Sequence, residues 1–359
     1  MRITVKVGSN VLTRPDGHLD ITRMSALVDQ IADLRRAGTE VILVSSGAVA
    51  AGRSALAGTD TGRLDAVSAR QLFSAVGQAR LIDRYVMLLA GHGLACGQVL
   101  TTKENFATRH HYLNQHNCME VMLRAGVVPV VNENDTVSVT ELMFTDNDEL
   151  SGLIAAMMDC DRLVLLSNID GVYTAHPDEP GAHLIPRISP GEEPEVSISA
   201  TRSSHGRGGM GTKYRVARRL AAEGIEVDIA NGTRPDIITH IILGSGAPQP
   251  YTAFVPTARP ISGVKRWLAH SGSFAKGTIV VNDGAAARLR SLTDAASVLG
   301  VGVTAVEGDF GHGEVVRVAT PNGRTLGWGK AECDADEARD RIGRSATRPI
   351  IHADYLYIE

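Results

Sequence analysis

Short apolar runs alternate with segments of helical periodicity over the first two-thirds of the chain. The apolar runs predict strands at residues 3–7, 41–44, 94–100, 127–131, 163–166 and 227–230. After the first run, apolar residues recur at helical spacing from Ile21 to Leu34, with Asp20 as the expected N-cap and Gly38 beyond the end. Continuously apolar strands separated by helices predict an α/β fold, in which helices sandwich a mostly parallel sheet.

The pattern changes near residue 245, where Gly, Ser and Pro become frequent. Residues 246–258 are expected to form a linker between a first domain, 1–245, and a second domain, 259–359. The second domain contains short β-type runs at 277–281, 315–318 and 350–352, with turn signals between them. It is therefore predicted to be a small, β-rich domain.

Composition excludes several classes of protein. The chain has 359 residues, of which 43% are hydrophobic and 21% charged, as is typical of a globular protein of about two domains. Its 36 basic and 40 acidic residues give a net charge of −4, which argues against a dedicated nucleic-acid binder. No apolar run is long enough to span a membrane, and no signal peptide is evident at the start. Four scattered cysteines favour a reduced, cytoplasmic setting.

A glycine-rich segment matches a dinucleotide-binding pattern without its expected context. The pattern G-x-G-x-x-G, which is typical of NAD-dependent dehydrogenases, is matched by Gly206-Arg207-Gly208-Gly209-Met210-Gly211. However, the residues before it are polar and do not predict a buried strand, and Thr212-Lys213 reverses the order of a P-loop. A loop that leads Lys213 into the first turn of a helix over 210–222 favours binding of an anion such as phosphate. An ordinary surface loop is the alternative.

Polar residues follow the predicted strands, at the edge of a parallel sheet where ligands bind. They are Lys6 and Ser46 near the ends of the first two strands, Asn132-Glu133-Asn134-Asp135 after 127–131, and Ser167-Asn168 after 163–166. Asp146-Asn147-Asp148 opens the helix that lies between the last two of these strands. Each stretch also has a structural explanation, such as a surface lysine or a helix N-cap. In combination they suit a polar substrate or a magnesium-bound nucleotide.

None of the twelve histidines falls into an array typical of a metal site or a catalytic triad. The lack of a candidate general base is compatible with phosphoryl transfer to a carboxylate, because that nucleophile is already an anion. Such a reaction requires lysines, magnesium and N–H donors directed at the transferring phosphoryl group.

Taken together, these stretches resemble the amino acid kinase superfamily, and within it the glutamate 5-kinases. The matching segments are Lys6-Val7-Gly8-Ser9, Ser46 to Gly52, Arg70-Gln71-Leu72, Ala75 to Gln78, Val128 to Asp135, Asp146-Asn147-Asp148, Asp170 to Thr174 and Gly208 to Lys213. The tail resembles the PUA domain that many bacterial members carry, at Lys265-Arg266-Trp267, Asn282 to Ala285 and Phe310 to Val316. The resemblance covers nearly the whole chain; Asn10, Thr145 and Asn168 depart from the family's usual residues.

The resemblance implies that the chain uses ATP and Mg²⁺ to phosphorylate the γ-carboxylate of L-glutamate, the first step of proline biosynthesis. It gives catalytic roles to Lys6, Lys213 and Asp148, the last of which would hold the two lysines in place. It implies that Ser46, Asp135 and Asn147 bind glutamate. The implied ATP-binding residues are Lys6, Ser167, Asn168, Arg207, Gly208, Gly209, Met210, Gly211, Thr212 and Lys213. No residue is assigned as a metal ligand.

The resemblance also implies partners and leaves two alternatives. Proline is the expected feedback inhibitor, the chain is expected to form a dimer or tetramer, and glutamyl phosphate reductase is a further expected partner. Binding to RNA or to a membrane is not expected. The first alternative is a related amino acid kinase acting on another carboxylate, such as N-acetylglutamate, although a PUA-like tail is not expected there. The second is the NAD-dependent dehydrogenase.

Overall fold

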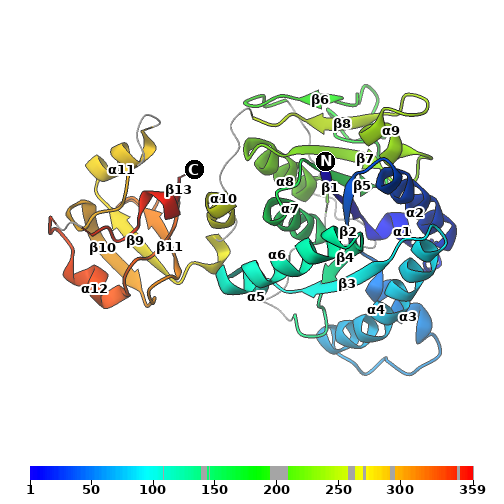
Figure 1. Cartoon of the computed structure of the whole chain (residues 1–359), viewed down its shortest axis with the longest axis horizontal. Helices are drawn as coiled ribbons and strands as arrows, with labels where there is room; N and C mark the ends of the chain where they lie inside the picture. Colours follow the sequence, from blue (N-terminus) through cyan, green and yellow to red (C-terminus); the bar gives the residue numbers. More distant parts are fainter. Residues whose placement is uncertain are drawn as a thin grey trace. The chain divides into compact units, whose positions relative to one another are not determined.

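Figure 1 shows the computed structural model of the chain. It describes residues 1–107, 109–138, 144, 146–194, 209–257, 263–269, 272–291, 296–345 and 348–358. The chain divides into two compact units, one formed by residues 1–105 and 113–260 and the other by residues 106–112 and 261–359. Within the described ranges, no helix has both the length and the apolar character that crossing a membrane requires.

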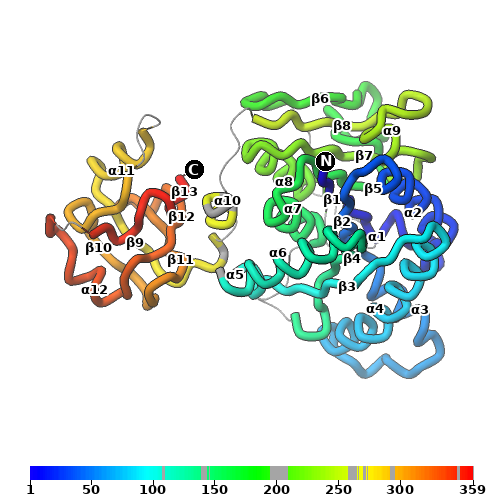
Figure 2. The backbone as a smooth tube through the Cα atoms, viewed as in Figure 1, coloured from blue at the N-terminus to red at the C-terminus, as the bar shows by residue number. Residues whose placement is uncertain are grey.

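The first unit is built on an eight-stranded sheet. Its strands are β1 (Arg2–Val7), β2 (Glu40–Ser45), β3 (Cys96–Thr101), β4 (Val128–Glu133), β5 (Arg162–Ser167), β6 (Arg187–Ile188), β7 (Glu226–Asn231) and β8 (Tyr251–Phe254). The order is β3-β4-β2-β1-β5-β7-β8-β6, and every pairing is parallel except that of β7 with β8. The tube in Figure 2 shows that the chain begins in the middle of this sheet, at β1. The predicted mostly parallel sheet is confirmed.

Helices pack against both faces of this sheet. The helices before residue 261 are α1 (Ser9–Leu12), α2 (Ile21–Arg36), α3 (Ala48–Ala55), α4 (Ala66–Ala90), α5 (Glu104–Ala107), α6 (Arg109–Arg124), α7 (Asn147–Met157), α8 (Met210–Ala222) and α9 (Ile237–Leu243), of which residues 106–112 belong to the other unit. On one face α2 packs against β2, α4 and α9, while α7 on the other face contacts the central strands and α8 (Figure 1). The expected cap is confirmed, because the Asp20 side chain accepts a hydrogen bond from the backbone N–H of Arg23.

Side chains alternate between the two faces of the sheet along β1, so its apolar residues and Lys6 lie on opposite faces. Ile3, Val5 and Val7 are fully buried in the hydrophobic core that includes residues of α2. Because successive side chains of a strand point to opposite faces, Lys6 lies on the other face, where α7 packs. A lysine in the central strand of the sheet is therefore directed at α7 rather than at water.

The second unit is a small five-stranded sheet with short helices. Its elements are α10 (Gly263–Ala269), β9 (Gly277–Val281), α11 (Asp283–Arg290), β10 (Val303–Gly308), β11 (Val315–Ala319), β12 (Thr325–Lys330), α12 (Ala335–Asp340) and β13 (Leu356–Ile358). The strand order is β10-β9-β11-β12-β13, and only β9 and β11 pair in parallel. This unit encloses its own hydrophobic core, so the predicted small β-rich domain is confirmed.

Two local predictions differ from the structure. Residues 246–258, expected to be a linker, include β8, whose Thr252 and Phe254 are buried and which pairs with β7 on one side and β6 on the other. The run 350–352 was predicted as a strand, but Ile351 makes only one isolated bridge, with Val298. The prolines near β8 were a weak signal for a linker, and the apolar residues at 350–352 were a weak signal for a strand. Whether a short segment becomes a strand depends on the partner with which it can pair.

Two glycines allow α3 and α4 to approach closely, which fixes the start of α3. A Cβ atom at Gly77 would lie 1.7 Å from the backbone oxygen of Ala48, and one at Gly52 would lie 1.7 Å from that of Phe73. Ala normally stabilises a helix interior by about 1 kcal/mol relative to Gly. We expect the opposite here, with Gly77→Ala lowering the free energy of unfolding by about 3 kcal/mol because the helices must separate. Urea unfolding measures this change.

Gly62→Ala is the matched control, because Gly62 lies in the connection between the same helices. Its Cβ would meet nothing closer than a carboxylate oxygen of Asp60 at 3.6 Å, which is ordinary contact. The free energy of unfolding should change by less than about 0.5 kcal/mol. An unchanged or raised unfolding midpoint for Gly77→Ala would show that the α3–α4 contact does not constrain the fold.

Candidate functional site

The carboxyl ends of the central strands open into one cavity of about 970 Å³. Among the described residues that line it are Lys6, Ser46, Asn132, Asp135, Asp146, Asn147, Asp148, Ser167, Asn168, Gly209, Met210 and Lys213. They come from β1, from the ends of β4 and β5, from the segments after β2, β4 and β5, and from the N-caps and first turns of α7 and α8. The structure thus brings together in one cavity residues that are up to 207 positions apart in the chain.

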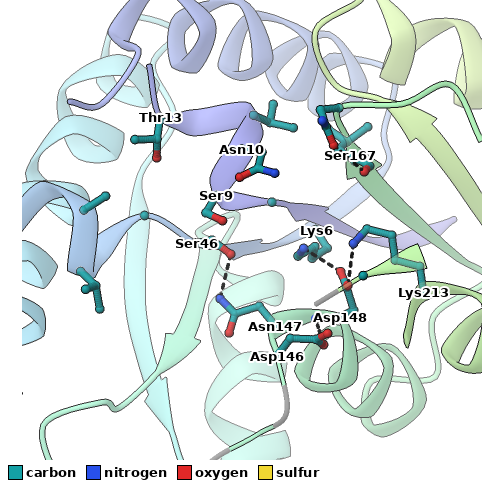
Figure 3. A pocket seen from close by; sticks show the side chains of 18 of the residues that line it. Lys6, Ser9, Asn10, Thr13, Ser46, Asp146, Asn147, Asp148, Ser167 and Lys213 are labelled. Atoms are coloured by element: carbon teal, nitrogen blue, oxygen red, sulfur yellow. Dashed lines mark hydrogen bonds and ion pairs between the residues drawn. The ribbon is translucent and has the colours of Figure 1, made fainter. Parts of the chain in front are cut away.

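A buried carboxylate between two lysines forms the centre of this site. Lys6 Nζ lies 2.6 Å from Asp148 Oδ1, and Lys213 Nζ lies 2.8 Å from Asp148 Oδ2 (Figure 3). Asp148 is fully buried, while Lys6 and Lys213 are 5% and 8% exposed. Two cations from β1 and α8 are therefore held side by side by the two oxygens of one side chain of α7.

The pKa shifts of this cluster have opposing causes. Burial raises the pKa of the Asp148 carboxyl, but the charges of Lys6 and Lys213 outweigh it and hold this pKa below its ordinary value. Burial lowers the pKa of Lys6, and the positive charge of Lys213 lowers it further, although Asp148 opposes both effects. Asp148 is thus the group that keeps a proton on Lys6 in this environment.

Asp146 fixes the first turn of α7, which carries Asp148. Its Oδ1 accepts hydrogen bonds from the backbone N–H groups of Asp148 at 2.9 Å and Glu149 at 3.0 Å, as an N-cap does. Burial, followed by the negative charge of Asp148, raises the pKa of Asp146. Its Oδ2 is buried and has no hydrogen-bond partner among the described residues.

An amide next to the lysine cluster connects the ends of two strands, β2 and β4. Asn147 Nδ2 lies 2.9 Å from the backbone oxygen of Ser45, 3.0 Å from Ser46 Oγ and 3.0 Å from Asn132 Oδ1. The chain turns from β2 into α3 at Gly47, whose φ of 100° is accessible to glycine but rarely to other residues. This turn leaves Ser46 in the cavity, where Figure 3 shows its hydroxyl facing Asn147.

An acidic end of the cavity is organised by an arginine from α4. Arg70 Nε donates to Asp135 Oδ1 at 2.7 Å, while its Nη2 contacts the same oxygen and also Glu133 Oε2 at 3.3 Å. The other oxygen of Glu133 accepts from Ser138 Oγ and from the backbone N–H of Phe144, both at 2.9 Å. Burial, together with the charge of Asp135, raises the pKa of Glu133.

The described residues predicted to contact nucleotide come from β1, from the end of β5 and from the start of α8. Ser167 ends β5 and Asn168 follows it, and both line the cavity together with Gly209, Met210 and Lys213. The predicted helix over 210–222 is confirmed as α8. Gly211 and Thr212 lie in its first turn but do not line the cavity. Arg207 and Gly208, like Thr145, lie outside the described residues.

Sequence reasoning did not assign a role to several residues that shape the site. Arg70 and Glu133 stand within the motifs, but nothing in their spacing shows that they would pair. A second example is the bidentate ion pair between Asp170, after β5, and Arg234, after β7. Arg234 Nε and Nη2 each donate to one oxygen of Asp170, both at 2.7 Å. This pair ties together two loops at the carboxyl edge of the sheet, and only the parallel pairing of β5 with β7 makes it possible.

Comparison with known proteins identifies the family of this chain. The amino acid kinase family matches residues 1–231, and the PUA domain matches residues 277–352. A glutamate 5-kinase of Bacteroides thetaiotaomicron is 56% identical over 100% of this chain and 98% of the relative. A glutamate 5-kinase of Chlorobaculum tepidum is 44% identical over 99% of this chain and 97% of the relative. A solved isopentenyl phosphate kinase has a TM-score of 0.48 and 19% identity over 70% of this chain and 100% of its own. This chain belongs to the amino acid kinase family and, within it, to the glutamate 5-kinases.

Proposed function

We propose that this chain transfers the terminal phosphoryl group of ATP to the γ-carboxylate of L-glutamate, forming γ-glutamyl phosphate, and that Lys6 and Lys213 are its catalytic cations. This reaction is the first step of proline biosynthesis. The observation that carries the mechanism is the pair of buried ammonium groups held on the two oxygens of Asp148. Both lysines line the cavity, so a bound phosphoryl group can reach them.

The chemistry explains why two lysines are needed. The attacking γ-carboxylate is already ionised, so no base has to remove a proton from it. The barrier lies instead in bringing this anion against the negative oxygens of the phosphoryl group, and fixed positive charges reduce that repulsion. Lys6 and Lys213 supply these charges, while Asp148 holds both ammonium groups in position.

The remaining predicted residues divide between the two substrates. We propose that Ser46 and Asn147 hydrogen-bond glutamate and that Asp135 binds its ammonium group. For ATP we propose Ser167, Asn168 and the segment from Arg207 to Lys213, whose described part begins at Gly209, the N-cap of α8. The amide groups at that helix start favour a phosphate.

Magnesium fits this site as the usual companion of ATP. Mg²⁺ binds through phosphate oxygens and one or two carboxylates, and when bound it neutralises phosphate charge. Asp146 Oδ2 is a buried carboxylate oxygen on the wall of the cavity without a hydrogen-bond partner among the described residues. We propose Asp146 as the side chain that holds the ion.

A panel of carboxylates tests the proposed substrate. ATP consumption should be rapid with L-glutamate and at least about a hundredfold slower with N-acetylglutamate, because acylation removes the ammonium charge that Asp135 would bind. Preferential turnover of N-acetylglutamate would instead identify a related kinase with another acceptor. Saturable binding of NAD, measured by fluorescence quenching, would support the dehydrogenase alternative.

Further partners follow from the same assignment. We propose proline as the feedback inhibitor and glutamyl phosphate reductase as the enzyme that takes up the product. We also propose a dimer or tetramer, supported by the position of β3 at the sheet edge, where Leu100 is exposed. RNA is not a proposed ligand, because the chain carries a net charge of −4. Four free cysteines support a reduced, cytoplasmic compartment.

A further inference from the structure

The head of an α-amino acid carries two charges, and the site described so far accounts for one of them. Asp135 is the proposed partner of the ammonium group, but the α-carboxylate lies on the same carbon atom and also requires a partner. A carboxylate that loses water on binding is stabilised by a cation, most effectively by an arginine, whose planar guanidinium matches it.

The described part of the cavity offers four lysine or arginine side chains: Lys6, Lys213, Arg53 and Arg70. The two lysines are held on Asp148 at the site of phosphoryl transfer. The guanidinium of Arg53, an exposed residue, lies over the ring of Phe73 at 5.4 Å from its centroid. Arg70 remains, and it lies directly beside Asp135.

Arg70 has the geometry for this contact. Its side chain is 22% exposed, and it lines the cavity together with both of its carboxylate partners. Nε and Nη2 make all of its hydrogen bonds, so Nη1 has no acceptor among the residues that the structure describes. A group that reaches Asp135 from the cavity therefore finds a guanidinium with unused donors next to it.

The charges at this end of the cavity also favour an ammonium group. One guanidinium faces the carboxylates of Glu133 and Asp135, which leaves an excess of one negative charge for an incoming ammonium group. Glu133 is additionally held by Ser138 and Phe144, so it anchors the arginine from the side opposite Asp135. Ser74 Oγ lies 3.4 Å from Asp135 Oδ2 and restrains that carboxylate.

We propose that Arg70 binds the α-carboxylate of L-glutamate while Asp135 binds its ammonium group, so that this ion pair determines specificity for an α-amino acid. The inference rests on the proposed role of Asp135. In this arrangement the ammonium group of the substrate contacts Asp135, and its α-carboxylate contacts Arg70. The γ-carboxylate, at the other end of the substrate, is then directed toward the two lysines.

The test compares L-glutamate with its α-carboxamide, which keeps the ammonium and γ-carboxylate groups but lacks the α-carboxylate charge. Steady-state kinetics give kcat/KM for both in the wild type, Arg70→Gln, Arg70→Lys and Arg53→Gln. The wild type should prefer glutamate by about a hundredfold, because the amide leaves the guanidinium without its anion. In Arg70→Gln this preference should fall to a few-fold, mainly through KM for glutamate. Arg70→Lys should retain part of it, and Arg53→Gln should keep all of it.

A purely structural role of Arg70 predicts a different outcome. If Arg70 only positioned Asp135, Arg70→Gln would lower kcat/KM equally for both compounds, and an unchanged preference would overturn the proposal. Thermal unfolding establishes that each variant is folded. If Arg70→Gln is not folded, the preference of Arg70→Lys for glutamate over the amide is compared with that of the wild type instead. Glutarate, which lacks the ammonium group, tests Asp135 separately. If Asp135→Asn still prefers glutamate over glutarate as strongly as the wild type, the role of Asp135 fails, whatever the amide comparison shows for Arg70.

Discussion

Replacing Lys213 by Met is expected to abolish phosphoryl transfer, lowering kcat by about a thousandfold or more while the protein stays folded. The substitution keeps most of the length of the side chain but removes one of the two charges directed at the phosphoryl group. Removing a single preorganised charge or donor at a developing oxyanion costs about 10²–10³ or more in rate. ATP consumption at saturating L-glutamate measures the loss.

The fold should survive because Asp148 keeps its second cation. Its Oδ1 lies 2.6 Å from Lys6 Nζ, so removal of Lys213 should leave no buried charge without a partner. Arg218→Met is the matched control: it removes a cation from the same helix, where Arg218 pairs with Glu193 at the surface. Its activity should be close to that of the wild type. Near-normal turnover by a folded Lys213→Met enzyme would refute the two-lysine mechanism.

The elements that position this cluster were largely predictable from local patterns. The apolar runs at 3–7 and 163–166 correspond to β1 and β5, and the helix expected over 210–222 is α8. Such signals are local, because a buried strand needs consecutive apolar residues and a helix start needs a suitable cap. The resemblance then indicated that Lys6 and Lys213 act together, and the structure places both on Asp148.

Contacts between distant side chains could not be predicted in the same way. Arg70 and Asp135 are 65 positions apart, and their ion pair depends on how α4 packs beside the end of β4. The period-2 alternation of β1 places Lys6 on the face opposite Val5, but it does not say that α7 covers that face. Similarly, β12 has glycines at 327 and 329, which weaken its sequence signal, yet pairing with β11 and β13 makes it a strand.

Asp148→Asn is expected to affect both activity and stability, because it removes the carboxylate that pairs with two buried ammonium groups. The free energy of unfolding at neutral pH should fall by about 3–5 kcal/mol, as when one member of a buried ion pair is deleted. The loss should be smaller in acid. The pKa of Asp148 is held below its ordinary value in the folded protein, so its stabilising effect is present above that ordinary value and disappears as the pH falls through the lowered one. Urea unfolding at several pH values measures this dependence.

The same substitution should lower kcat by about a hundredfold and move its alkaline limit to lower pH. Without Asp148 the lysines are no longer fixed, and misplacement of a catalytic group by about 1 Å costs roughly that factor. The pKa of Lys6 is already lowered by burial and by Lys213, and Asp148 is the main group opposing this. Its removal lets Lys6 lose its proton at lower pH, so the charge needed at the phosphoryl group disappears earlier as the pH rises. Asp178→Asn, which removes an exposed carboxylate from the rim of the cavity, should leave the profile in place. An alkaline limit that does not move in Asp148→Asn would mean that the proton on Lys6 does not govern the rate.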